Sequence, residues 1–351
     1  MSGVIGIDLG VTRVAVALLR DRERSEPLVR PTERSDTDAL VGQITELVDQ
    51  ARTDDVAAVG VGVARVVEFE TGRVVAAGRR PGPGGNGAVD LPLANVPLRH
   101  VLEERLGLPV FVDNRTSVSA LAEAHDEQLE QVARHLVFLG IGAGVGGGLV
   151  LGGRIYRGAT GGAGELGHTI VGLDLAGAVP APMRFPQPGS LEFVASGHAL
   201  DGLAGQARNV HPKSELARLR GEGKPVLGTD VIRAARDGDP SAARMIEIWG
   251  QRIGIGVANA INAFDPEEVV IGGYAAGAGD LLVEAARPLS PGSPRRALRR
   301  RPDSGPSRRP SRRGTSSRSR AARGRGSRPP CRRRRRRRRA RSAGSARARA
   351  S

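Results

Sequence analysis

The sequence predicts an α/β protein with two lobes, followed by a C-terminal tail that does not fold. Through residue 287, short apolar runs alternate with segments of helical periodicity, which is the pattern of α/β proteins. Three glycine-bearing turns lie after or between predicted strands, at residues 8–13, 142–148 and 271–273. Their spacing of about 130 residues indicates a nucleotide-binding cleft between two lobes.

The first lobe is predicted from four local patterns. Residues 4–9 and 14–19 are apolar runs around the turn GVTR, so we expect a β-hairpin. Residues 36–52 place apolar side chains at helical spacing, with Ser35 or Asp36 as the cap. The next predicted elements are a strand at 56–63, a hairpin at 67–75, a loop at 78–87, a helix near 97–107 and a strand at 108–112.

The second lobe follows with a similar alternation. We expect a helix from about residue 116, an apolar glycine-rich hairpin over 135–151, a helix over 241–264, and a strand at 268–271 that ends in Gly272-Gly273. We place the first lobe at residues 1–117, the second lobe at 118–287 and the tail at 288–351.

Charge separates the tail from the rest of the chain. The net charge is +16, but residues 288–351 hold 25 arginines and one aspartate, whereas residues 1–287 hold 28 basic and 36 acidic residues. The tail shows no periodicity and includes eight consecutive arginines at 332–339, so it cannot bury enough apolar surface to fold. It is either a segment that binds nucleic acid or anionic surfaces through phosphates, or a non-native C-terminus. We favour the second, because the domain ahead of it stops before its last elements.

Several classes of protein are excluded. The chain has no apolar run of 18 residues, so we expect no membrane span. The N-terminus is predicted to be a strand and not a signal peptide. The one cysteine, Cys331, allows neither an internal disulfide nor a cysteine-based metal site. The expected location is the cytoplasm.

The first turn has the chemistry of a metal-phosphate site. Backbone N–H groups near Gly10 and the hydroxyl of Thr12 can contact phosphate oxygens, while Asp8 faces the cation. Magnesium at Asp8 is therefore part of the prediction.

Three longer segments carry a family resemblance. They are GGRIYRGATGGAGELGHTIV (152–171), GSLEFVASG (189–197) and GIGVANAINAFDPEEVVIGG (254–273). With them the chain resembles the ROK family of sugar kinases and sugar-responsive repressors over roughly residues 3–285. The resemblance implies the two-lobe sugar kinase/Hsp70/actin-like (ribonuclease H-like) fold. A DNA-binding domain of the repressor type is not expected, because the first phosphate-turn strand begins at residue 4.

The resemblance also implies an activity and its residues. Family members transfer the γ-phosphoryl group of ATP, with Mg²⁺, to a hexose or an amino sugar, and are commonly oligomers. The family's sugar ligands carry over to Asn114, Glu165, His168 and Glu192. The phosphate-binding positions carry over to the three turns: Asp8, Gly10, Thr12, Gly142, Gly144, Gly146, Gly272 and Gly273.

The family's general base is missing. The Asp of the family's Asn-Asp pair aligns with Arg115, and a guanidinium stays protonated and cannot accept the hydroxyl proton. Asp113 already fills the preceding acidic position, and strand alternation points it away. If Arg115 only makes a surface ion pair, the expected partner is Asp113 or Glu123. No catalytic residue is then intact, which predicts impaired catalysis, as in a pseudokinase.

Other family positions have changed as well. Met183, Phe185 and Ser190 replace the three cysteines of the family's zinc site, so we expect no zinc. In the turns, Val11 replaces a glycine and Ala143 a threonine, and Ala64-Arg65 replaces a Pro-Gly near the sugar. We expect Val11 to crowd the phosphate and to resist a positive φ.

Three functions remain open. The chain is a sugar kinase homologue with weak or absent activity, or a non-catalytic sensor of a sugar or sugar phosphate in which Arg115 pairs with an anionic group, or a nucleic-acid binder through its tail. The sequence does not identify the sugar.

Overall fold

The computed structural model describes residues 2–75, 90–172, 186–206, 213–287 and 297–300. The loop predicted at 78–87 and residues 301–351 of the predicted tail lie outside these ranges. Within them, no helix combines the length and the apolar character that crossing a membrane requires.

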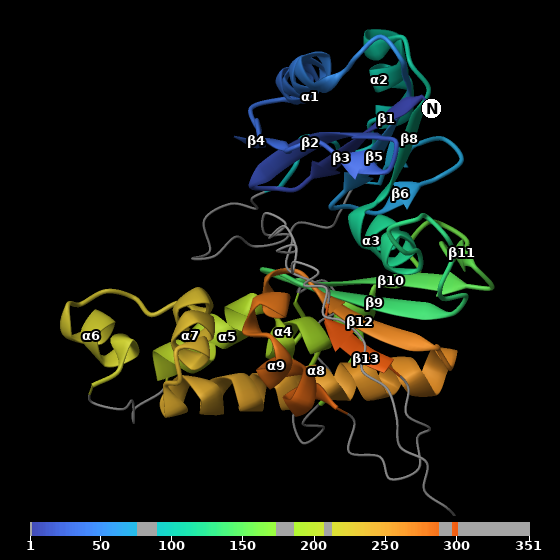
Figure 1. The fold of residues 1–351 in the computed structure, drawn as a ribbon. Helices are drawn as coiled ribbons and strands as arrows, with labels where there is room; N and C mark the ends of the chain where they lie inside the picture. The colour runs from blue at the N-terminus through green and yellow to red at the C-terminus, as the bar shows by residue number, and fades with distance from the viewer. Residues whose placement is uncertain (1, 76–89, 173–185, 207–212, 288–296, 301–351) are drawn as a thin grey trace, which may run out of the picture. The chain divides into compact units, whose positions relative to one another are not determined.

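The first sheet is mixed and has six strands, in the order β3-β2-β1-β5-β8, with β4 also paired to β2 (Figure 1). β1 and β2 form the predicted antiparallel hairpin, and β5 and β8 add in parallel. The bounds are β1 Gly3–Leu9, β2 Arg13–Arg20, β3 Glu23–Arg24, β4 Leu28–Pro31, β5 Val56–Val63 and β8 Val110–Asn114. The predicted strand at 108–112 is therefore confirmed, but displaced by two residues.

Helices α1 (Thr37–Ala51) and α2 (Leu98–Leu106) cover one face of this sheet. Asp36 caps α1 by accepting the Ala39 N–H at 2.8 Å, and the helix buries one apolar stripe in the first core. A small hairpin, β6 (Val67–Glu68) with β7 (Arg73–Val74), forms where it was predicted. The alternation within β1 leaves the opposite face more open.

The second sheet repeats the arrangement of the first. Its order is β11-β10-β9-β12-β13: an antiparallel hairpin of β9 and β10, followed by β12 and β13 in parallel. The bounds are β9 Leu136–Ile141, β10 Val145–Leu151, β11 Arg154–Ile155, β12 Glu268–Gly272 and β13 Ala297–Arg300. A repeated hairpin with two added parallel strands is the topology of a two-lobe actin-like fold.

Helices cover both faces of the second sheet (Figure 1). α3 (Arg115–Glu123) packs on β9 and β10, and α8 (Pro240–Phe264) lies in the core of the opposite face. Asp239 caps α8 and Pro240 opens it, as the predicted helix at 241–264 requires. The remaining helices are η1 Leu166–His168, α4 Leu191–Ala195, α5 Gly197–Gln206, α6 Glu215–Gly221, α7 Gly228–Arg236, η2 Tyr274–Ala278 and α9 Asp280–Ala286.

β13 corrects one prediction. Residues 297–300 fall in the range for which the sequence predicts no folded structure, yet they pair with β12. Arg299 donates to Glu268 at 2.7 Å and to Glu123 at 2.6 Å. Hydrogen bonds to an existing strand edge and two charge-assisted side-chain contacts order a segment that has no periodic pattern of its own.

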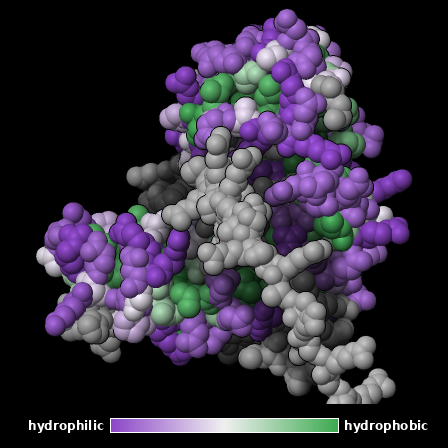
Figure 2. All heavy atoms as spheres, viewed as in Figure 1, coloured by the Kyte–Doolittle hydropathy of each residue, from purple (hydrophilic) through white to green (hydrophobic). Residues whose placement is uncertain are grey.

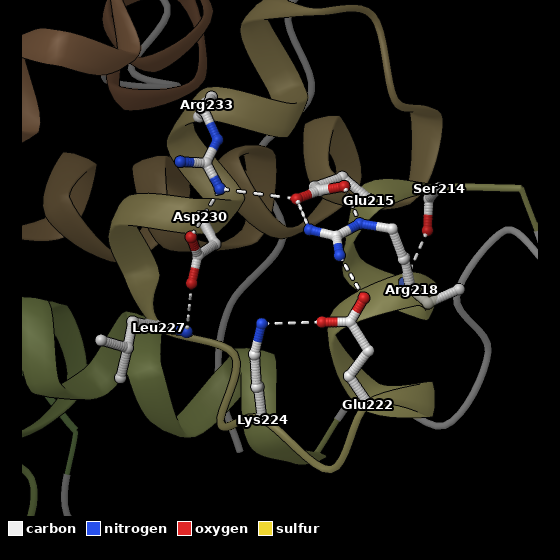
Figure 3. Close-up of polar contacts among 9 residues, drawn as sticks. Ser214, Glu215, Arg218, Glu222, Lys224, Leu227, Asp230 and Arg233 are labelled. Atoms are coloured by element: carbon white, nitrogen blue, oxygen red, sulfur yellow. Dashed lines mark hydrogen bonds and ion pairs between the residues drawn. The ribbon is translucent and has the colours of Figure 1, made fainter.

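Surface charges join α6 and α7. Arg218 lies between Glu215 and Glu222, and Arg233 lies 2.8 Å from Asp230 and 3.9 Å from Glu215 (Figure 3). Exposed ion pairs each contribute little, so this network fixes orientation more than stability. Figure 2 shows a mostly hydrophilic visible face with separate hydrophobic patches.

Candidate functional site

The first glycine turn joins β1 to β2 and is closed by its own backbone. The N–H of Gly10 donates to the carbonyl of Arg13 at 3.0 Å, and the hydroxyl of Thr32 donates to the carbonyl of Gly10 at 2.8 Å. Thr12 is exposed at the tip. Val11 packs against the first core and has no positive φ, so the backbone strain expected from its side chain is absent.

Asn114 ends β8 and begins α3. Its Oδ1 accepts the Thr116 N–H at 2.8 Å and the Ser117 N–H at 3.3 Å, and its Nδ2 donates to the carbonyl of Arg65 at 2.9 Å. The main role of the Asn114 side chain is therefore to cap the start of α3. One N–H of the amide remains for a ligand, because a primary amide has two.

Thr116 connects this cap to the second sheet. Its hydroxyl lies 2.5 Å from Asn114 Oδ1 and 2.7 Å from the carbonyl of Gly147, and its single proton can go to either. β10 is rich in glycine because Thr116 packs directly against this strand. A Cβ on Gly148 would lie 2.2 Å from the carbonyl oxygen of Thr116, and one on Gly146 would lie 2.7 Å from its methyl group. We predicted Gly146 as a phosphate contact, and the structure places it under α3.

Asp113 is held by a residue that the sequence did not single out. Its Oδ2 accepts from Arg157 Nε at 2.9 Å and lies 2.8 Å from Nη2, and its Oδ1 accepts the Asn114 N–H at 2.7 Å. Asp113 is 6% exposed, and the guanidinium of Arg157 lies 3.6 Å above the ring of Phe69. Both oxygens of this buried carboxylate therefore already accept hydrogen bonds within the protein.

Arg115 points to the first glycine turn. Its Nη1 lies 3.5 Å from Asp8 Oδ1, and a Cβ on Gly10 would lie 3.1 Å from that nitrogen. The partners expected from the sequence were wrong: Asp113 binds Arg157, and Glu123 binds Arg299. Prediction from sequence favours partners that are close along the chain. The sheet instead brings β1, with Asp8, beside the start of α3.

The second and third turns lie against each other. The Gly142 N–H donates to the carbonyl of Gly144 at 2.8 Å, and Ala143 is exposed between them. Gly273 has a φ of 77°, and a Cβ there would lie 2.3 Å from the carbonyl oxygen of Ile141. Gly272 is equally confined, since a Cβ would lie 2.3 Å from the ring of Phe138.

Three of the predicted sugar ligands gather around the start of β10. His168 Nε2 lies 3.5 Å from Glu165 Oε2, and the Glu192 Oε2 accepts the Val145 N–H at 2.9 Å. The chain between them is tied together, because the Leu191 N–H donates to the carbonyl of Thr169 at 2.9 Å. Glu192 is 6% exposed, and this contact directs its carboxylate toward the second turn.

Two further positions differ from the family pattern. Arg65 forms an ion pair with Asp90, which fixes its guanidinium at 12% exposure beside the backbone that Asn114 contacts. Ser190 stands where the family has a zinc ligand, and its hydroxyl accepts the Phe193 N–H at 3.2 Å to cap α4. Met183 and Phe185 lie outside the described residues. Among the described residues, no group of three or more His, Cys, Asp or Glu is arranged to hold a metal.

A magnesium ion does not fit at Asp8 as the side chains stand. Oδ1 of Asp8 is shielded from solvent and has no hydrogen-bond partner in the described part of the chain, which is the kind of oxygen a cation uses. The permanent charge of Arg115, however, already lies 3.5 Å away. A divalent cation on the same oxygen would face that guanidinium.

Fold and site together define a two-lobe α/β protein of the sugar-kinase class, with three glycine turns and a set of carboxylate, amide and imidazole groups beside them. The chain belongs to the ROK family, whose profile matches residues 4–297.

Its relatives include both enzymes and regulators. A glucokinase of Halalkalibacterium halodurans is 31% identical over 288 residues, covering 80% of this chain and 82% of that protein. A xylose repressor of Caldicellulosiruptor bescii is 29% identical over 299 residues, covering 82% of this chain and 69% of that protein. The crystal structure of a ROK glucokinase from Streptomyces griseus, in complex with glucose and AMPPNP, has a TM-score of 0.67 and 26% identity, covering 85% of this chain and 93% of that one.

Sequence reasoning missed Arg157, Thr116 and Asp90. Arg157 lies within GGRIYRGATGG, a segment read only for its family match. Its partner Asp113 lies 44 residues away in the chain, so only the tertiary structure brings the two together.

Proposed function

We propose that the protein is a ROK sugar-kinase homologue that binds a hexose or an amino sugar and a nucleotide in the cytoplasm, with strongly reduced phosphoryl transfer. The observation that carries this proposal is the position of Arg115. It stands at the family's general-base position, and its guanidinium is engaged by Asp8 at 3.5 Å. A group that is always protonated cannot take the hydroxyl proton.

The sugar side has donors and acceptors of the right kinds. The Glu165 carboxylate and the His168 ring lie 3.5 Å apart, with side chains 39% and 25% exposed, and both can reorganise around hydroxyl groups. Asn114 keeps one amide proton. Glu192 accepts the Val145 N–H at 2.9 Å, which keeps its carboxylate beside the second turn.

No neighbouring carboxylate replaces the lost base. Asp113 precedes Asn114 but is bound through both oxygens, and Arg157 holds it at the edge of the site. The carboxylate of Asp8 lies 3.5 Å from the guanidinium of Arg115 and forms an ion pair with it. The family's base position therefore offers no acceptor for the proton of the sugar hydroxyl, because Arg115 occupies it.

The test is a coupled assay with ATP, Mg²⁺ and a panel of hexoses. We expect Arg115→Asp to raise turnover by about 10²- to 10⁴-fold over the unaltered protein, the range that general-base catalysis supplies. Arg154→Asp, a charge reversal at an exposed position on β11, is the matched control and should change little. Turnover of the unaltered protein at about 1–100 s⁻¹, as ordinary kinases show, would contradict the proposal.

Binding of sugar is tested separately by calorimetry. We expect heat of binding for a hexose in the unaltered protein and its loss in Glu165→Ala. If no sugar of the panel gives heat, the protein has lost the sugar site as well as the base, and the proposal fails.

A non-catalytic sensor of a sugar or sugar phosphate is the second candidate. Arg115 also favours this second function. It places a cation where a kinase needs a base, and this cation can bind an anionic group of a ligand. The third hypothesis, nucleic-acid binding through the arginine-rich tail, depends on residues outside the described ranges and stays a prediction.

A further inference from the structure

The surroundings of Arg115 hold its guanidinium in one place. A Cβ on Gly62, at the end of β5, would lie 3.4 Å from the Cα of Arg115, so β5 supports the residue from one side. A Cβ on Gly10 would lie 3.1 Å from Nη1, so the turn supports the guanidinium from the other. The Gly62 distance is an ordinary van der Waals contact, whereas the Gly10 distance is a close approach to the end of the side chain.

The guanidinium of Arg115 contacts Asp8 but does not use all of its N–H donors in doing so. Its distance of 3.5 Å to Asp8 Oδ1 is longer than a hydrogen bond, so the contact is an ion pair. Arginine has five N–H donors, and the side chain of Arg115 is 43% exposed. Donors of the guanidinium therefore remain for a ligand.

The charge at this turn is positive. Asp8 contributes one negative charge, while Arg115 and the exposed Arg13 each contribute one positive charge. Such a patch attracts an anion and repels a divalent cation. A planar guanidinium also matches the oxygen geometry of a phosphate group, which a point charge does not.

We infer that Arg115, with the Gly10 turn, forms a binding site for a terminal phosphate group that works without a divalent cation. The inference rests on the proposed function, since it assumes that a nucleotide or a sugar binds beside these turns. The phosphate can come from either side: from the end of a nucleoside triphosphate, or from a sugar phosphate. Arg115 supplies in its own chain the positive charge that a metal ion brings to such a group.

The experiment is calorimetric titration of the full chain with ATP, glucose 6-phosphate and glucose, each in EDTA and in excess Mg²⁺. We expect ATP, glucose 6-phosphate or both to bind in EDTA at least as tightly as in Mg²⁺. Arg115→Gln should weaken that binding by about 10- to 100-fold, the effect of losing a charge-assisted hydrogen bond. Arg154→Gln, at an exposed position on β11, should bind as the unaltered protein does.

The two phosphate ligands identify the source. Loss confined to ATP assigns the site to the nucleotide, and loss confined to glucose 6-phosphate assigns it to the sugar; both results support the inference. Arg115→Lys keeps the charge without the fork and should fall between the unaltered protein and Arg115→Gln. This graded order also guards against a folding defect, which would weaken binding of glucose as well.

Two results would overturn the inference. One is binding of both phosphate ligands in Mg²⁺ only; the other is an Arg115→Gln variant that binds as tightly as the unaltered protein in EDTA. Failure of the proposed function has a different signature, because then neither glucose nor any other hexose of the panel gives heat in either buffer, whatever ATP and glucose 6-phosphate do.

Discussion

Replacing Arg157 by methionine should destabilise the protein by about 3–4 kcal/mol, because the change leaves a buried carboxylate without its cation. Asp113 is 6% exposed, and two nitrogens of Arg157 lie within 2.9 Å of its Oδ2. Methionine keeps most of the apolar stem that packs near Phe69, so the change mainly removes the charge and its hydrogen bonds.

The magnitude follows from burial. Removing one partner of a buried ion pair costs roughly 3–5 kcal/mol. Arg157 retains 28% exposure, so water reaches part of the pair, and the lower end of that range applies. The guanidinium also lies 3.6 Å above the Phe69 ring, and a stacked cation adds about 0.5–1 kcal/mol at a site of this exposure.

Urea denaturation followed by circular dichroism measures this cost as a shift in midpoint at constant m value. Arg154→Met, at an exposed position of β11, is the control and should stay within about 0.5 kcal/mol of the unaltered protein. Combining Arg157→Met with Asp113→Asn should recover part of the loss, because no buried charge then remains. A loss below about 1 kcal/mol for Arg157→Met would refute the reasoning, since exposed pairs contribute no more than that.

Three further changes test other parts of the fold. Gly148→Ala should cost about 1–3 kcal/mol in the same urea denaturation, because its Cβ would lie 2.2 Å from the Thr116 carbonyl oxygen. Gly42→Ala, in open space within α1, should stabilise by about 0.5–1 kcal/mol in that measurement. The carboxylate of Glu267 accepts hydrogen bonds from the N–H groups of His135 and Arg134, which lowers its pKa. The stability that these bonds contribute is complete above the pKa of Glu267 in the unfolded chain and is lost as pH falls through the lowered pKa of the folded protein. Glu267→Gln should therefore flatten the acid limb of a pH–stability curve, and an unchanged limb would contradict the assignment. Phe111 is 56% exposed on β8, so Phe111→Ser should reduce concentration-dependent light scattering with little change in unfolding free energy, and equal scattering would show that this face does not associate.

Strong local patterns predicted most of the fold. The helix at 36–52 forms because one apolar stripe and the Asp36 cap agree with each other. The hairpin at 4–19 forms because its two apolar runs face one core. β13 was missed because four residues, two of them arginines, give no alternation to read; pairing with the edge of β12 decides their structure.

The candidate site was less accessible from sequence. The family pattern identified Arg115 as the residue at the general-base position. Its partner Asp8 lies on β1, far away in the chain, whereas the sequence pointed to the nearby Asp113 and Glu123. Glu192 stays a predicted sugar ligand, and the structure adds the hydrogen bond that it accepts from the Val145 N–H. Long-range ion pairs depend on sheet register, which short-range patterns do not encode.

β13 has a practical consequence for any shortened form of this protein. The composition change at 288 suggests cutting there, yet that cut would remove the strand that covers the outer edge of β12. Unpaired N–H and C=O groups along an open edge are a template for pairing with another chain. A protein that ends at residue 287 is thus expected to aggregate through this open strand edge, and not because of the arginine-rich tail, which it lacks. Shortened chains should keep residues up to Arg300, and with them the contacts of Arg299 to Glu123 and Glu268.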